Sequence, residues 1–190
     1  MDQEFLAKIE QMKEDYYSHN KKNILFKKSQ KQDCALSICN NMDVNQLIEN
    51  TMHVIENTNS VYFSYPVFKL YASDQNYDLI ISHIFSLFDR CIDKFGTYQV
   101  HMDLQSYTVS ACERYKPIFP VLFNECFRKE KTYSDTLDRL FIYNTPNAME
   151  TIIQIMRPLV HDNVRHKIVF YNKAQSAEIM NNLLTNQHNK

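Results

Sequence analysis

Residues 137–146 read LDRLFIYNTP, and residues 147–171 continue as NAMETIIQIMRPLVHDNVRHKIVFY. The short apolar run at residues 140–143 predicts a buried strand. Apolar residues at helical spacing then predict a helix over residues 148–160, and residues 167–171 return to the composition of a strand. A strand, a helix and a strand in this order form a right-handed crossover. This stretch therefore predicts an α/β fold with a parallel sheet.

The alternation of helix and strand continues on both sides of this unit. The further elements predicted are a helix over residues 80–95, a strand over 100–104, a helical region over 110–129 and a helix over 173–184. Gly96 should end the first helix, because a C-terminal cap often needs positive φ. Pro117 and Pro120 should kink or split the helical region. Capping-box pairs, Asn147 with Glu150 and Asn172 with Gln175, should start the last two helices.

The N-terminal part is predicted to be mainly helical, with helices over residues 2–17, 33–40 and 44–57. Asp43 should cap the third of these helices. Residues 61–72 are rich in aromatic and β-branched side chains and predict a strand pair or one bent strand, with Pro66 at an edge or bend. We therefore predict a small N-terminal helical region at residues 1–59. An α/β domain with a largely parallel sheet and crossover helices should follow at residues 60–190.

Composition excludes several classes of function. The chain has 190 residues and a net charge of -1, which gives no general attraction to nucleic acid. Its single glycine, Gly96, excludes the glycine-rich loops that bind nucleotide phosphates. The abundance of Lys, Asn, Ile and Tyr suits an AT-rich genome, such as that of a protist or a large DNA virus. No nucleic-acid partner is expected.

Cysteine use and hydropathy indicate the compartment. The five cysteines are odd in number and form no C-x-x-C pair, which favours a reducing environment. The acidic N-terminus has no apolar signal core, and nowhere does the chain supply the run of about 18 apolar residues that a membrane span needs. We expect a cytoplasmic protein whose contact with membranes is peripheral and transient.

The central stretch also carries a family pattern. A strand ends in Asn144-Thr145-Pro146, the next helix ends in Arg157-Pro158-Leu159-Val160, and the following strand opens with Lys167-Ile168. Upstream, Asp103-Leu104 ends one strand, and Pro66-Val67-Phe68 is similar to a Pro-Val-aromatic opening strand. In order and spacing these segments resemble the CRAL-TRIO (Sec14-like) lipid-binding family. The resemblance covers residues 33–184.

The resemblance implies an apolar cavity above the sheet, closed by the helix after Asn-x-Pro, which acts as a gate and swings aside at a membrane. The residues expected in the pocket and gate are Phe141, Tyr143, Met149, Ile152, Ile153, Met156 and Leu159. Asp135 and Lys167 match two positions that hold an inositol phosphate headgroup in phosphoinositide-binding members, whereas Val164 replaces a hydroxyl residue. The implied cargo is a phospholipid or another hydrophobic ligand, with no other cofactor.

A second function remains open, because the interior can be filled instead of hollow. The aromatic side chains that would fill it are Tyr107, Phe123, Phe127, Phe141 and Tyr143. An apolar stripe at helical spacing also normally packs on a core, so the gate helix can be an ordinary surface helix. Some relatives with this fold bind other proteins. The alternative is therefore a protein-interaction module without lipid cargo.

Enzymatic activity is not expected. His161, Asp162 and His166 are close in sequence, but two histidines in a loop without a further ligand are typical of a solvated turn. No cysteine has the sequence context of an activated thiolate, and one glycine excludes a G-x-S-x-G elbow. His83 and His101 lie in periodic segments and are predicted to be structural. No catalytic residue and no metal site are predicted.

Overall fold

The computed structural model describes residues 3–20, 27–128 and 133–185. Within these residues the centre is a five-stranded sheet with the order β1-β2-β3-β4-β5. The strands are β1 (Met52–Val54), β2 (Ser60–Ser64), β3 (Tyr98–Asp103), β4 (Leu137–Tyr143) and β5 (Ile168–Phe170). β1 is antiparallel to β2, and every later pair is parallel. The predicted fold class, a largely parallel sheet with crossover helices, is confirmed.

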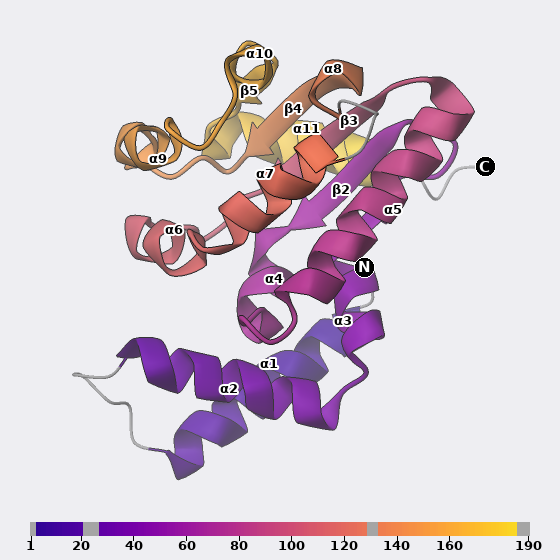
Figure 1. Cartoon of the computed structure of the whole chain (residues 1–190). Coiled ribbons are helices and arrows are strands. Elements are labelled where there is room, and N and C mark those ends of the chain that lie inside the picture. The colour runs from indigo at the N-terminus through magenta and orange to yellow at the C-terminus, as the bar shows by residue number, and fades with distance from the viewer. Residues whose placement is uncertain (1–2, 21–26, 129–132, 186–190) are drawn as a thin grey trace.

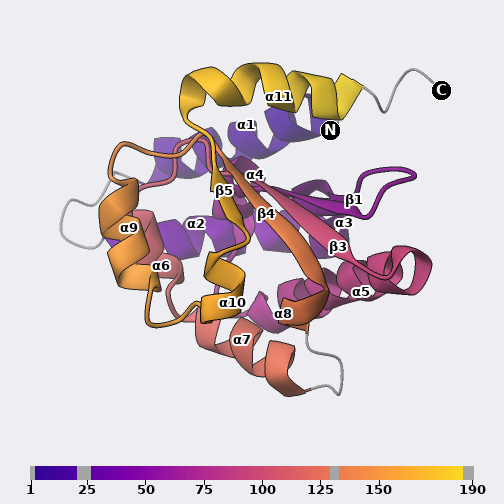
Figure 2. The same cartoon turned by 90° about the horizontal axis from the view of Figure 1, so that it is seen from above.

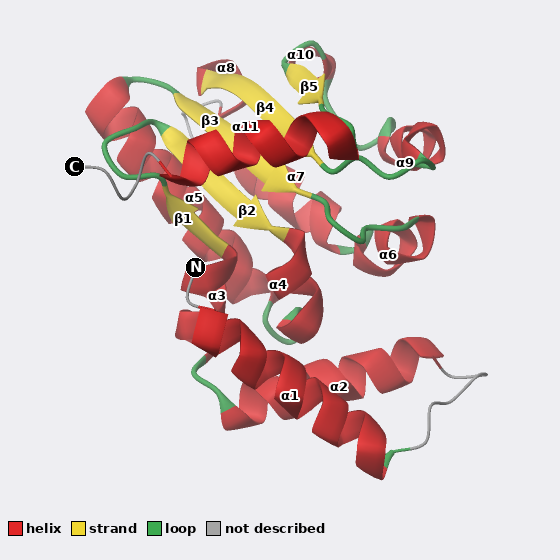
Figure 3. Cartoon of the chain, turned by 180° about the vertical axis from the view of Figure 1, so that it is seen from behind, coloured by secondary structure: helices red, strands yellow, loops and turns green. Residues whose placement is uncertain are grey.

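Helices cover both faces of the sheet. They are α1 (Gln3–His19), α2 (Lys27–Asn41), α3 (Val44–Thr51), α4 (Tyr65–Tyr71), α5 (Tyr77–Phe95), α6 (Val109–Tyr115), α7 (Ile118–Arg128), α8 (Tyr133–Thr136), α9 (Met149–Met156), α10 (Asp162–Arg165) and α11 (Lys173–Thr185). α5 and α7 lie on one face of the sheet (Figure 1), and α11 crosses the opposite face (Figures 2 and 3). α1 and α2 lie below the sheet next to α4 (Figure 1).

The register of the strands assigns alternate side chains to these two faces. Val61, Val100 and Leu140 belong to the face that packs on α5 and α7, which we call the core face. Tyr62, His101 and Phe141 are paired neighbours on the opposite face, which we call the α11 face. The core face is apolar, whereas the α11 face is aromatic and polar.

The contiguous apolar core joins the core face to helices from both halves of the chain. Ile9 of α1, Ile38 of α2, Leu47 of α3, Tyr71 of α4 and Ile80 of α5 all belong to it and are at most 1% exposed. Burial of each such side chain contributes about 1.5–3 kcal/mol relative to exposure. The N-terminal helices are therefore part of the same packed body as the sheet. The domain boundary between residues 59 and 60 stays a prediction, and β1 pairs with β2 across it.

Several local predictions are confirmed. α5 ends at Gly96, whose φ is 79° and whose N–H donates to Ile92 O at 2.7 Å. The helical region splits between α6 and α7, next to Pro117. The amides of Asn172 and Gln175 each donate to the other residue's side chain at 3.0 Å, which is the predicted capping box. Each of these features depends on residues close in sequence.

Two predictions in the first third are wrong. Residues 65–71 form helix α4 instead of strand, and Pro66 lies in its first turn, where a missing N–H costs no helical hydrogen bond. The third helix ends at Thr51 instead of residue 57, because β1 begins at Met52 and pairs with Phe63 in β2. In both cases long-range packing overrides the local pattern.

The start and the end of α9 also differ from prediction. The side chain of Asn147 does not cap this helix; Ala148 occupies the N-cap position, and the Met149 amide donates to Pro146 O in a backbone turn. The regular helix ends at Met156, four residues before the predicted end. The four-residue helices α8 and α10 were not predicted, since they are shorter than any periodic signal.

Candidate functional site

The predicted gate helix α9 follows the carboxyl end of β4 and lies beside α6 (Figures 1 and 2). Its Ile152 is 3% exposed, whereas Ile153 is 40% exposed. Met149, Met156 and the following Leu159 are partly buried. One apolar side chain is thus buried and its neighbour faces solvent.

α9 packs outside the main core. No α9 side chain belongs to the contiguous apolar core of the described residues, although Ile152 is buried. Its main neighbour is α6, which is itself only seven residues long. An element with few apolar contacts to the core opens at a lower free-energy cost than the rest of a domain.

The segment that carries α9 is fastened at both ends. On the β4 side, the amide and the hydroxyl of Thr145 both donate to Tyr171 O, at 3.1 and 3.0 Å. On the far side, Arg165 donates from Nε to Val160 O at 2.9 Å and from Nη2 to Arg157 O at 2.7 Å. Arg165 also pairs with Asp162. Residues 146–160 therefore form a strap between two anchored points.

Asn144 sits at the β4 end of this strap with φ of 53°. Its side-chain amide donates to Asp103 Oδ1 at 2.8 Å, and its backbone N–H donates to Ser176 Oγ at 2.7 Å. Asparagine tolerates this left-handed conformation better than most residues do. The position explains why an asparagine suits the Asn-x-Pro sequence at this turn.

The two predicted headgroup residues come together at the amino end of β4. The Lys167 ammonium donates to the backbone carbonyl oxygens of Ser134 at 2.9 Å and Asp135 at 3.3 Å, and also to that of Leu137. An ammonium has three N–H donors. In this conformation the donors of Lys167 are therefore directed at the backbone around α8.

Asn163 joins this region to α10 and was missed by sequence reasoning. Its side-chain N–H group donates to Asp135 Oδ1 at 3.2 Å and to Ser134 Oγ at 3.3 Å. Asn163 Oδ1 lies 2.6 Å from His161 Nδ1. A polar residue in a loop gives no periodic signal, so only the spatial approach of α8 and α10 could have identified it.

Phe141 and Tyr143, the other predicted pocket residues, lie on the α11 face. The Tyr143 ring stacks on Tyr171 with centroids 5.3 Å apart, and Phe141 stacks on His101 at 4.8 Å. Tyr143 is 1% exposed, and neither ring belongs to the main core. Both rings thus lie in one stacked layer with His101 and Tyr171, on the face of the sheet that α11 crosses.

His101 is the polar centre of this aromatic layer. Its Nδ1 lies 2.8 Å from the Tyr143 hydroxyl, and its buried Nε2 has no hydrogen-bond partner among the described residues. Burial lowers the pKa of His101 from 6.5 to about 4, because the charged ring would be desolvated. The imidazole is neutral at physiological pH and cannot serve as an exposed base.

Comparison with known protein families agrees with this architecture. The family model for the CRAL/TRIO domain matches residues 45–188, which are about three quarters of the chain. The chain belongs to the CRAL/TRIO domain family. A comparison with curated proteins finds no match.

CRAL/TRIO domains bind lipids and other hydrophobic ligands and are generally binding or transfer domains without enzymatic activity. The matched region of this CRAL/TRIO chain begins within α3 and includes the whole sheet, α9 and α11. The strap and the aromatic layer are therefore both features of the family region. None of the helices described in the structure is both long and apolar enough to span a bilayer.

The thiols and the potential metal ligands of this CRAL/TRIO domain can be assessed for the described residues. Among the described residues, no cluster of three or more His, Cys, Asp or Glu side chains could hold a metal ion. Burial raises the pKa of the Cys34, Cys39, Cys91 and Cys112 thiols, which keeps them protonated and poorly nucleophilic. The side chains of Phe123, Cys126 and Phe127 lie outside the described part of the chain.

Proposed function

We propose that this CRAL/TRIO domain holds a phospholipid, or a similar hydrophobic ligand, beneath α9, and exchanges it at a membrane when α9 swings aside. The observation that carries this proposal is the strap at residues 146–160. It bears an apolar helix outside the main core and is fastened by Thr145 and Arg165 at its ends. Such a segment can move while the core remains folded.

Burial of the acyl chains supplies the free energy of binding. Each buried methylene contributes about 0.8 kcal/mol, so one acyl chain supplies on the order of 10 kcal/mol before ordering costs. Met149, Ile152, Ile153, Met156 and Leu159 are the gate side chains that would contact it. The half-exposed Ile153 offers a first contact with a bilayer.

Selectivity for one lipid headgroup requires polar residues that contact it, and Asp135 and Lys167 are the candidates. A phosphate group would replace backbone carbonyls as the acceptor for the Lys167 ammonium, and a charge-assisted hydrogen bond is stronger than one to a neutral carbonyl. Binding of a headgroup would thereby loosen the contact between Lys167 and α8. We place this activity in the cytoplasm, with transient contact to membrane surfaces.

One observation favours the alternative function, a protein-interaction module without lipid cargo. Phe141 and Tyr143 stack against His101 and Tyr171, so these predicted pocket residues fill the layer beneath α11. A filled aromatic interior does not require a ligand. The two functions differ in whether purified protein carries an extractable amphiphile.

Native mass spectrometry of the full chain distinguishes the two functions. The expected result is a stoichiometric mass increment, which organic extraction identifies as a phospholipid or another amphiphile. An apo mass that stays unchanged after incubation with vesicles of mixed phospholipids would reject the lipid-binding function. That outcome would leave the protein-interaction module as the better interpretation.

A further inference from the structure

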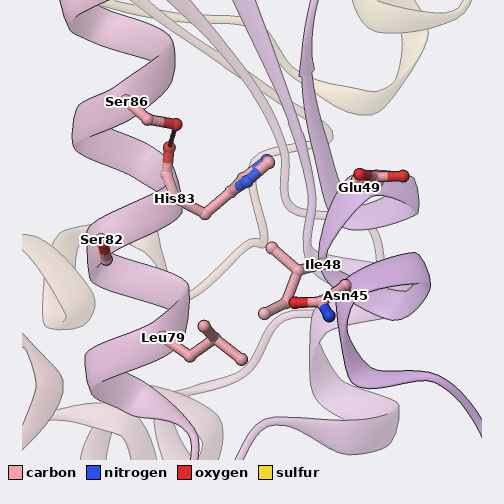
Figure 4. A pocket seen from close by; sticks show the side chains of 7 residues that line it. All are labelled: Asn45, Ile48, Glu49, Leu79, Ser82, His83 and Ser86. Carbon is pink, nitrogen blue, oxygen red and sulfur yellow. Dashed lines mark hydrogen bonds between the residues drawn. The ribbon is translucent and has the colours of Figure 1, made fainter.

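A pocket between α3 and α5 lies apart from the strap. Its volume is about 280 Å³, and it opens to solvent. The residues that line it are Asn45, Ile48, Glu49, Leu79, Ser82, His83 and Ser86. The first three come from α3 and the last four from α5, and the side chains of His83 and Leu79 extend toward α3 (Figure 4).

The pocket combines an apolar wall with a negative rim. Ile48 is 2% exposed and forms the floor, whereas Leu79 is 46% exposed at the mouth. Glu49 is exposed and is in neither of the ion pairs found among the described residues, and no lysine or arginine lines the pocket. The only formal charge on its lining is therefore the Glu49 carboxylate.

His83 adds a second acceptor to this lining. Its Nε2 lies 3.2 Å from Met52 O. A carbonyl oxygen can only accept, so Nε2 carries a proton, and in the Nε2–H tautomer of the ring Nδ1 is an acceptor. Met52 is also the C-cap residue of α3, and a helix C-terminus carries partial negative charge. A cation in the pocket would therefore interact favourably with the Glu49 carboxylate, with His83 Nδ1 and with the C-terminus of α3.

We propose that this pocket receives an arginine side chain from a partner protein. The aliphatic stem would pack between Ile48 and Leu79, and the guanidinium would donate to the Glu49 carboxylate and His83 Nδ1. Arginine suits the site better than lysine because its planar fork pairs with a carboxylate in two hydrogen bonds. The pocket and α9 lie on opposite sides of the molecule (Figures 1 and 2). The pocket is thus separate from the residues proposed for lipid exchange.

The test uses the full chain and a peptide probe. Acetyl-Ala-Ala-Arg-Ala-Ala-amide is titrated into ¹⁵N-labelled protein, and backbone amide shifts are followed by NMR. Saturable shifts confined to the amides of α3 and α5 are expected, without shifts in α9. The same peptide with citrulline in place of arginine, which has no charge, should bind about three-fold more weakly at low salt. Equal binding of the two peptides, or shifts scattered over the surface, would overturn the proposal.

Two variants identify the carboxylate. Glu49→Gln should weaken binding of the arginine peptide about three-fold. Glu56→Gln, which changes an exposed carboxylate outside the pocket, should leave that binding unchanged. An equal effect of both variants would show general charge attraction and reject the site.

N-acetyl-arginine amide tests the source of the cation. If this small amide binds and the pentapeptide does not, the pocket accepts a free cation and the protein partner is ruled out.

Discussion

Lys167 illustrates how one side chain can hold two short elements in place. It lies directly before β5 and donates to the carbonyl oxygens of Ser134, Asp135 and Leu137 around α8. The last carbonyl groups of a helix have no intrahelical partner. A lysine at this position supplies those partners and links the start of β4 to the start of β5.

Lys167→Met should lower the free energy of unfolding by about 1–3 kcal/mol, because the carbonyl groups around α8 lose a charged donor. Urea denaturation followed by circular dichroism measures this loss. Lys173→Met, at an exposed lysine that begins α11, is the control and should change stability by less than about 0.5 kcal/mol. If the two variants were equally stable, Lys167 would have no structural role.

Because of His101, the free energy of unfolding should decrease as the pH falls into the acid range. Its pKa is about 4 in the folded protein and 6.5 ordinarily, so the unfolded chain binds a proton first as the pH falls. The contribution of the neutral His101 ring to the free energy of unfolding is at its full value above pH 6.5, and it decreases as the pH falls from 6.5 to 4. At about 1.4 kcal/mol per pKa unit, the loss is about 3 kcal/mol.

His101→Gln removes this titration. The difference in unfolding free energy between wild type and variant should shrink or reverse by about 3 kcal/mol from pH 7 to pH 4, as measured by urea titrations at several pH values. A difference that is constant over this interval would mean that His101 does not titrate on unfolding. The carboxylates titrate in both proteins and therefore cancel in the comparison.

At the scale of elements, α5 depends on a single glycine. Gly96 has φ of 79°, and a Cβ added there would meet nothing within 4 Å. Any effect of Gly96→Ala must therefore come from the backbone conformation and not from a clash. We expect a loss of about 1 kcal/mol in unfolding free energy, measured by thermal or urea denaturation. Gly96→Asn should lose less, since asparagine tolerates positive φ; an alanine variant as stable as wild type would contradict the argument.

α9 should tolerate charge without unfolding, because it packs outside the main core. Ile153→Asp with Met156→Asp should abolish lipid retention or vesicle-to-vesicle exchange, since two carboxylates would face the acyl chains or the bilayer. Circular dichroism should show a folded protein. The measurement is transfer of a fluorescent phospholipid between vesicles.

The matched control places the same charges on the polar side of α9. Thr151→Asp with Gln154→Asp changes two exposed residues and should leave transfer within two-fold of wild type, as an order-of-magnitude expectation for surface changes. Normal transfer by the Ile153 and Met156 variant would reject the gate. A loss of transfer in both variants would indicate general repulsion from the membrane.

At the scale of the whole molecule, the two faces of the sheet are packed by different means. The core face packs with the five helices α1 to α5 in one apolar core. The α11 face instead carries the stacked layer of His101, Phe141, Tyr143 and Tyr171. Ser176 of α11 is buried there and bonds to Asn144 N. Because the N-terminal helices share the apolar core with the sheet, they should unfold together with it.

Ile9→Ala tests that cooperativity. Ile9 of α1 is fully buried, so its truncation should cost about 2–5 kcal/mol. The loss should appear in one transition when unfolding is followed by circular dichroism and by tyrosine fluorescence. Lys8→Ala, at an exposed neighbour, should change little. Two separate transitions would show instead that residues 1–59 fold independently of residues 60–190.

The sequence by itself determined the features that arise from neighbouring residues. The mutual caps of Asn172 and Gln175, the positive φ of Gly96 and the break of the helix next to Pro117 are all local. The order of strands and helices around residues 137–171 also determined a parallel sheet, because a helix between two strands returns the chain to the end of the sheet where the first strand began. The family resemblance matched Asp135 and Lys167 to two headgroup positions; the Lys167 ammonium donates to the backbone oxygen of Asp135 at 3.3 Å, and a role of the two residues in headgroup binding stays a prediction.

Only the tertiary structure decided which faces these elements present and what their polar groups contact. Residues 65–71 have the composition of a strand, yet burial of Phe68 and Tyr71 among α1, α2 and α3 makes them a helix. Alternation in β4 separates Phe141 from Ile142, but only the tertiary structure shows that Phe141 lies on the α11 face, where its ring stacks on Tyr171. The acceptors of Lys167 lie about 30 residues away in sequence. Local periodicity cannot encode such contacts, because they depend on which distant segments pack together.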